Sequence, residues 1–121
     1  MIPKFRAWIK SKRKLLPVSQ MIWHKGDISR ILTVEGAVLD SHLAEDVVLM
    51  QSTGLFDKNG KEVFEGDVVR MHSGELLPVR LHHGMFGPVC YYVSSVFEKV
   101  GNIFENPELT EHPDFKEATN D

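Results

Sequence analysis

Four basic side chains near the N-terminus are the first candidates for chemistry, because cationic groups attract phosphates and acidic partners. Together with an arginine and a tryptophan just before them, they form a candidate nucleic-acid-binding set: Lys10, Lys12, Arg13, Lys14, Arg6 and Trp8. No acidic residue precedes Asp27, so the charge of this segment is purely positive. The competing interpretation is a solvated hairpin tip, since lysine and arginine are ordinarily exposed in turns.

Aromatic stacking offers a related possibility for nucleic acid. Trp8 and Tyr92 could stack on the bases of a single strand, with Arg6 and Arg80 supplying positive charge nearby. Aromatic residues make up 9% of the chain, however, which is what a hydrophobic core of this size normally uses. A core role therefore competes with the stacking platform.

Catalytic groups are sparse in this sequence. Glu65 and Asp67 flank a glycine and could divide the acid and base roles of a carboxylate pair. A turn explains them better, because an aspartate after a glycine readily accepts hydrogen bonds from nearby backbone N–H groups. Cys90 lies between valine and tyrosine and is better explained as a small core residue than as a nucleophile. We therefore expect no catalytic residue and no enzyme activity.

The six histidines give no metal-binding pattern. None of them forms an i,i+4 pair or a His-Glu-x-x-His motif. His82 and His83 are adjacent, so they point to opposite faces if they lie in a strand. The sequence therefore predicts no metal site and no cofactor.

Composition limits the class of protein. The 121 residues suit one compact domain, and 42% hydrophobic with 26% charged residues is typical of soluble globular proteins. The single cysteine excludes an internal disulfide, and no apolar run approaches the roughly 20 residues that cross a bilayer. These features favour a cytoplasmic protein with no membrane partner.

Alternating apolar residues predict strands along most of the chain. Residues 4–18 have the pattern of a hairpin with a polar tip, and a second short pair is expected from 21–23 and 28–34. The one helix signal in the first half is weak: Asp40 and Ser41 could cap a single helical turn over His42–Glu45. A strand rich in β-branched residues should follow over 46–51.

Turn residues punctuate the centre of the chain. Asn-Gly sequences accommodate the positive φ angles of tight hairpins, and glycine can take positive φ without a steric clash. The predicted structural turn residues are Gly54, Asn59, Gly60, Gly66 and Asp67. Further strands are expected over 68–71, 76–81, 89–93 and 97–102.

This spacing predicts a mainly β fold, with a small barrel-like (SH3-like) core, an N-terminal β-hairpin region and little helix. We expect one β-rich domain over residues 1–109, followed by a polar acidic tail over 110–121. Within that domain, 1–46 would form the N-terminal part and 47–109 the barrel-like core.

The central residues also carry a family resemblance. Leu49–Leu55, Asp57–Glu62 and Phe64–Val69 resemble the signature of the YopX family of phage and prophage proteins. Ile2–Trp8 is similar to the opening of that family, and Val100–Leu109 is similar to its close. The resemblance implies a predominantly β protein of phage or prophage origin, in the host bacterial cytoplasm, with no established activity or catalytic residues.

The chain departs from the family pattern at Ile9, where an acid often follows the tryptophan, and over residues 17–45. Structure in that divergent stretch is therefore less firmly predicted than in the centre of the chain.

Three function classes follow. The leading one is a non-enzymatic phage accessory protein, a binding or assembly module for an unknown host or phage macromolecule. The second is a nucleic-acid-binding protein that uses the basic N-terminal hairpin. The third is a self-assembling homo-oligomer, because six of the 14 Lys and Arg residues lie within the first 14 positions while the last 24 residues hold seven acids.

Overall fold

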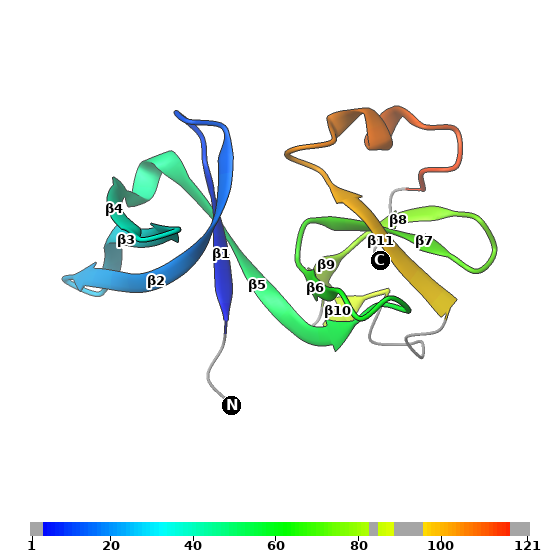
Figure 1. Ribbon diagram of the computed structural model, residues 1–121, viewed down its shortest axis with the longest axis horizontal. Coiled ribbons are helices and arrows are strands. Elements are labelled where there is room, and N and C mark those ends of the chain that lie inside the picture. Colours follow the sequence, from blue (N-terminus) through cyan, green and yellow to red (C-terminus); the bar gives the residue numbers. More distant parts are fainter. Residues whose placement is uncertain (1–3, 83–84, 89–95, 117–121) are drawn as a thin grey trace. The chain divides into compact units, whose positions relative to one another are not determined.

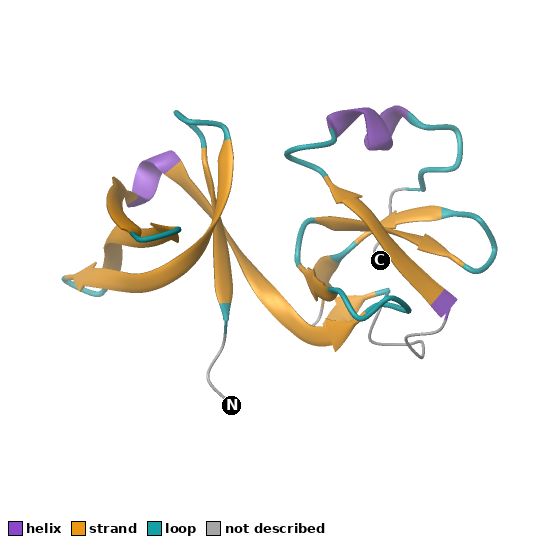
Figure 2. Ribbon diagram, in the orientation of Figure 1, coloured by secondary structure: helices purple, strands orange, loops and turns teal. Residues whose placement is uncertain are grey.

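The computed structural model describes residues 4–82, 85–88 and 96–116, and these residues form two compact units, Met1–Gln51 and Ser52–Asp121. Strands dominate both units, and helix is limited to short 3-10 segments (Figures 1 and 2). The prediction of a mainly β protein with little helix is confirmed, while the sheets in the described part of the chain are not closed into a barrel.

The first unit is an antiparallel sheet in which the first four strands form a meander and the fifth returns to pair with the first. Its strands are β1 (Phe5–Ile9), β2 (Lys14–His24), β3 (Asp27–Glu35), β4 (Val38–Leu43) and the first part of β5 (Val47–Phe56). β1 pairs with both β2 and β5, which places it inside a six-stranded sheet of order β4-β3-β2-β1-β5-β6. The predicted hairpin over residues 4–18 is present.

The long strand β2 joins what the sequence suggested were two separate hairpins. Its pairing with β3 shifts register between Val18 and Gln20 and again between Ile22 and Trp23. Such bulges bend a strand and increase its twist, so eleven residues can follow a curved sheet without a break. Ala7, Ile9 and Ile31 form the buried cluster of this unit.

The helical turn predicted over His42–Glu45 is present as a short 3-10 turn, but it starts two residues later, and its predicted cap is wrong. Residues 38–43 form strand β4, and the only helical residues nearby are the 3-10 segment η1 (Ala44–Asp46). The Asp40 carboxylate accepts a hydrogen bond from the Ser41 N–H group and another from Lys12, and it caps no helix. Pairing with β3 over six residue pairs outweighs the weak local capping signal.

The second unit holds short strands in small sheets. The end of β5 pairs with β6 (Glu62–Phe64), and β7 (Asp67–Met71) lies between β8 (Leu76–Pro78) and β11 (Phe97–Asn102). β9 (Arg80–His82) pairs with β10 (Met85–Gly87), and the 3-10 segment η4 (Pro107–Glu111) follows β11. The buried cluster of this unit consists of Val63, Val69, Met71, Val79 and Phe97.

Among the described residues, the predicted strands of this unit are present, and one of them is divided. The strand expected over 76–81 is broken at Val79, whose N–H donates to the carbonyl oxygen of Asp67 at 2.8 Å. Pro78 immediately before it has no N–H to donate to a ladder. The strand expected over 97–102 is β11, whereas the strand expected over 89–93 lies outside the described residues.

Candidate binding surface

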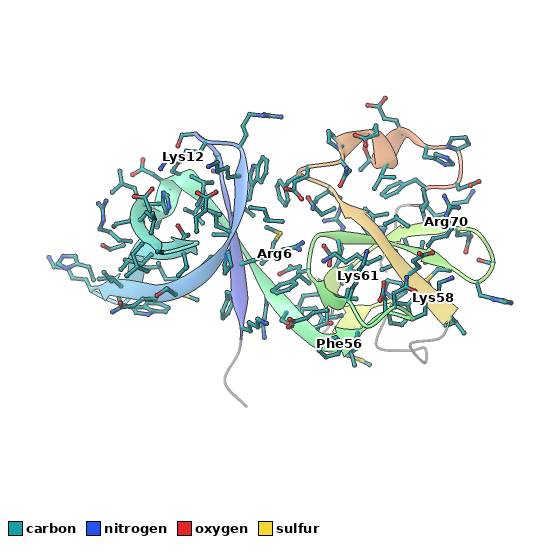
Figure 3. All side chains as sticks on the ribbon, in the orientation of Figure 1. Arg6, Lys12, Phe56, Lys58, Lys61 and Arg70 are labelled. Atoms are coloured by element: carbon teal, nitrogen blue, oxygen red, sulfur yellow. The ribbon has the colours of Figure 1, made fainter. Side chains whose placement is uncertain are left out.

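The basic side chains of the candidate nucleic-acid-binding set lie at and beside the β1–β2 turn, where three of them meet groups of the same unit. Lys12 forms an ion pair with Asp40 of β4, and Lys14 Nζ lies 3.2 Å from a carboxylate oxygen of Glu35 of β3. Lys10 donates through Nζ to a carbonyl oxygen of η1 at 3.2 Å. Figure 3 shows Lys12 beside this turn. Acidic partners therefore offset much of the positive charge at the tip.

The charge states of the Lys12 pair follow from its hydrogen bond. That bond holds the pKa of the Asp40 carboxyl below its usual range and raises the pKa of the Lys12 ammonium. Both groups stay ionised at neutral pH, and both are about half exposed, so solvent screens their attraction. Arg13 is exposed at the turn itself, with a positive φ of 52°.

Arg6 and Trp8 lie apart from the exposed tip, in the middle of β1. Their exposed fractions are 7% and 8%, and Arg6 Nη2 lies 3.7 Å from the Sδ atom of Met50. A buried ring offers little surface on which a base could stack. Of the other proposed platform residues, Arg80 is exposed on β9 and Tyr92 lies outside the described residues.

The turn after β5 is built around a buried carboxylate. Asp57, which is 3% exposed, accepts hydrogen bonds from the N–H groups of Asn59, Lys61 and Lys99 at 2.8 to 2.9 Å. Burial opposes the charged form, but these three donors outweigh it and hold the pKa of Asp57 below its usual value. Gly60 has a φ of +79°, which completes the turn.

The turn before β7 uses a second buried carboxylate. Asp67 is 0% exposed, accepts a hydrogen bond from the Phe64 N–H group at 2.8 Å, and has an oxygen 3.2 Å from Lys99 Nζ. Gly66, at a φ of +90°, donates to the Val79 carbonyl oxygen at 2.9 Å. Gly54 also has positive φ, at +76°. The Asp67 carboxylate therefore stabilises the backbone of the turn. This is the role that the sequence favoured over catalysis.

A surface pocket of unit 2 collects several ionic side chains between β7 and β11. Its lining residues are Lys58, Arg70, Met71, His72, Val96, Phe97 and Glu98. Lys58 lies 3.6 Å from Glu98, and Arg70 donates to the Gly74 carbonyl oxygen at 2.8 Å and lies 3.4 Å from Asp114. The two cations that could attract an anion here already have acidic neighbours.

Neither a metal cluster nor a membrane helix is found in the described residues. Within residues 4–82, 85–88 and 96–116, no group of three or more His, Cys, Asp and Glu side chains could hold a metal ion. In the same part of the chain, no helix is long and apolar enough to span a membrane.

The outer face of the β2–β3–β4 meander carries three exposed apolar side chains, one on β2 and two on β4. Cross-strand register places Ile22, Arg30 and Leu43 opposite one another, and Val34 opposite Leu39, all on the face away from the buried Ile31. Leu39 is 63% exposed, Leu43 50% and Ile22 39%. The exposed apolar residues of unit 2 come from the end of β5, from β9 and β10, and from β11: Leu55, Phe56, Leu81, Met85 and Val100.

Sequence reasoning missed this outer face because it assigned residues 42–45 to a helix. The signal was present: Leu39, Ser41 and Leu43 alternate with Asp40 and His42, which is the period of a strand. Exposed apolar side chains on one sheet face are typical of surfaces that contact another macromolecule. The meander is therefore the candidate binding surface.

The chain resembles known proteins over most of its length. A family model described as YopX protein matches residues 4–111. Protein EF1440 from Enterococcus faecalis has 26% sequence identity and a TM-score of 0.67, over 90% of this chain and 98% of that one. Protein yopX from Bacillus subtilis has 18% identity and a TM-score of 0.63, over 88% and 96% respectively. Among curated proteins, no sequence matches the chain significantly.

Proposed function

The chain belongs to the YopX protein family, and we propose that it is a phage-encoded, non-enzymatic module that binds a protein through the outer face of the β2–β3–β4 meander. It would act in the cytoplasm of the bacterial host. Family membership supports the phage origin, and the structure supports the choice of surface.

The exposed outer face is the observation that carries the proposal. Leu39 and Leu43 project from β4 with half or more of their surface in water, and Ile22 and Val34 extend the apolar area across β2 and β3. Arg30 lies within this area and donates through Nε to Ser41 Oγ at 2.7 Å. An apolar area with an arginine inside it matches the composition of protein-binding surfaces, which are enriched in apolar residues and arginine.

Charge favours a protein partner over nucleic acid. The basic tip is the segment that would contact phosphates, yet Lys12 and Lys14 are paired with carboxylates of their own unit. Phosphates would have to compete with those carboxylates for the same ammonium groups. The whole chain has a formal net charge of -3, which adds a general repulsion.

Capture from a lysate of phage-infected bacteria tests the proposal. Tagged wild-type protein is compared with Leu39→Lys, which places a charge on the outer face, and with Leu81→Lys, a matched exposed leucine on β9. We expect a protein that wild type and Leu81→Lys both retain and that Leu39→Lys loses at least tenfold. A parallel sample is digested with nuclease.

Two results would contradict this proposal. Equal capture by Leu39→Lys and Leu81→Lys would remove the outer face from binding. A partner that disappears after nuclease digestion would instead support the basic hairpin as a nucleic-acid contact, and Lys12→Glu, Arg13→Glu and Lys14→Glu together should then abolish retention and its salt dependence.

A further inference from the structure

Strand β4 is an uncovered edge. It ends the sheet order β4-β3-β2-β1-β5-β6, and in the described part of the chain no strand pairs with its other side. An edge strand presents unpaired N–H and C=O groups, and an apolar one is a template for pairing with another strand. The Ser41 N–H group donates to the side-chain carboxylate of its neighbour Asp40, at 2.9 Å, and not to the backbone of an adjacent strand.

The sequence of this edge is complementary to itself. Leu39-Asp40-Ser41-His42-Leu43 has a leucine at each end and one polar residue, Asp40 or His42, on each side of the central serine. When two copies pair antiparallel with Ser41 opposite Ser41, Leu39 lies opposite Leu43 and Asp40 opposite His42. Cross-strand apolar pairs stabilise a sheet, and this register places no like charges opposite one another, so it is favourable.

The adjacent register, centred on Asp40, is less favourable. A two-fold axis normal to the sheet keeps the outer face outward in both copies, so only residues of the same face can lie opposite one another. Moving the centre by one residue to Asp40 places Asp40 opposite Asp40, and like charges directly opposite are destabilising. The same shift places Leu39 opposite Ser41 and loses the leucine pair.

We infer that β4 pairs with β4 of a second copy of this chain, antiparallel and centred on Ser41. The ladder would replace the Ser41–Asp40 hydrogen bond with backbone bonds, while Asp40 keeps its ion pair with Lys12. His42 is held from within its own unit, where Nε2 lies 2.8 Å from Thr33 Oγ1. Because each copy covers the edge of the other, the assembly closes as a dimer.

This inference deepens the proposed function and rests on it in one respect, since both assign binding to the same meander. Pairing through the edge leaves the outer face of each copy open. It also makes the two apolar faces continuous, so the protein partner would meet twice the surface.

Disulfide trapping tests the contact directly. In a Cys90→Ser background, Ser41→Cys places two thiols opposite one another at about the 5 Å Cβ separation of facing strand residues, close enough to be bridged with a small adjustment. The matched control is Ser19→Cys, an exposed serine of β2 that lies inside the sheet. We expect mild oxidation to give a covalent dimer with Ser41→Cys and none with Ser19→Cys. Equal trapping of both, or of neither, overturns the inference.

Register is tested by charge exchange, with mass measured by light scattering during size exclusion. Wild type should have twice the chain mass of 13.8 kDa at micromolar concentration. Leu39→Lys with Leu43→Lys should give monomers, whereas Leu39→Lys with Leu43→Glu should restore the dimer, because position 39 faces position 43 of the other copy. Circular dichroism confirms that each variant is folded. A wild-type monomer, or a double-lysine variant that keeps the wild-type mass, overturns the inference.

Ser41→Pro separates this inference from the proposed function, because it removes the edge N–H group and leaves both leucines in place. The variant should be a monomer that still captures the protein partner. An unchanged mass overturns the self-pairing. A monomeric wild type whose partner is lost with Ser41→Pro also overturns it, in favour of an extended peptide as the occupant of the edge.

Discussion

Carboxylates have opposite roles in the two units of this chain. In unit 2, Asp57 and Asp67 are buried and accept hydrogen bonds from backbone N–H groups, so they hold turns to strands. In unit 1, Asp40 and Glu35 are exposed and pair with lysines of the β1–β2 turn region. The carboxylate group is the same in both units, and the difference is whether it is buried or lies in solvent.

This difference separates stability from binding. A buried carboxylate that loses its donors leaves unpaired groups in the interior, which is costly. An exposed pair exchanges protein contacts for water at little cost. Replacing a buried acid of unit 2 should therefore lower the stability of the protein. Replacing an exposed acid of unit 1 should leave stability nearly unchanged and should mainly affect binding.

The largest effect is expected from Asp67→Ala. The change leaves the Phe64 N–H group without its acceptor and Lys99 without its carboxylate, so the free energy of unfolding should fall by about 3 kcal/mol. Urea denaturation measures the loss. Lys99→Met keeps the bond to Phe64 and should lose less. If Asp67→Ala unfolds at the wild-type urea midpoint, the contrast between the two units does not hold.

A loss of about 2 kcal/mol at neutral pH is expected from Asp57→Asn, because an amide cannot replace a charged acceptor of three N–H groups. The folded-state pKa of Asp57 is lowered, so its contribution is present above its unfolded-state pKa and is lost as pH falls through the folded-state value. Denaturation curves at several pH values check this.

The difference between wild type and Asp57→Asn should therefore be constant above about pH 5 and shrink as the solution is acidified toward about pH 2. A difference that stays constant over this range would assign the acid sensitivity of the protein to other carboxylates.

Gly60→Val should cost about 1 kcal/mol, since a β-branched residue is strained at a φ of +79°. No heavy atom lies within 4 Å of the position that its Cβ would occupy, so backbone strain is the whole effect. Gly60→Asn is the matched control, because asparagine tolerates positive φ and should lose less. Thermal melts of the two variants measure the difference in stability loss. Equal midpoints would mean that the turn does not need the positive φ conformation.

The smallest effect is expected from Lys12→Ala. Its ion pair with Asp40 is about half exposed on both sides, so the melting temperature should stay within the error of the measurement at ordinary salt. A clear fall in melting temperature would show that the ion pairs of the β1–β2 turn region stabilise unit 1. The carboxylates of the two units would then differ only in how much they contribute to stability.

Local pattern was sufficient for most of the strands and for the turns. Alternation predicted β1, β7 and β11 with bounds close to those observed, and Asn59-Gly60 predicted a turn that the structure contains. The prediction failed at His42 and Leu43, which lie in β4, because the Asp40-Ser41 pair before them resembles a helix cap. Whether an aspartate caps a helix or lies in a strand depends on the neighbouring strand, and here β3 pairs Thr33 with Asp40 and Ile31 with His42.

For the candidate surface, the sequence determined which side chains are apolar, which are charged and which face each strand residue takes, because side-chain alternation follows from backbone geometry alone. The tertiary structure decided which of these groups are buried and which are paired. Asp57 meets the Lys99 N–H group from 42 residues away, and Lys12 meets Asp40 from 28. Burial and pairing depend on strands brought together across such separations, so only the folded chain distinguishes the acids that hold unit 2 together from the exposed meander of unit 1.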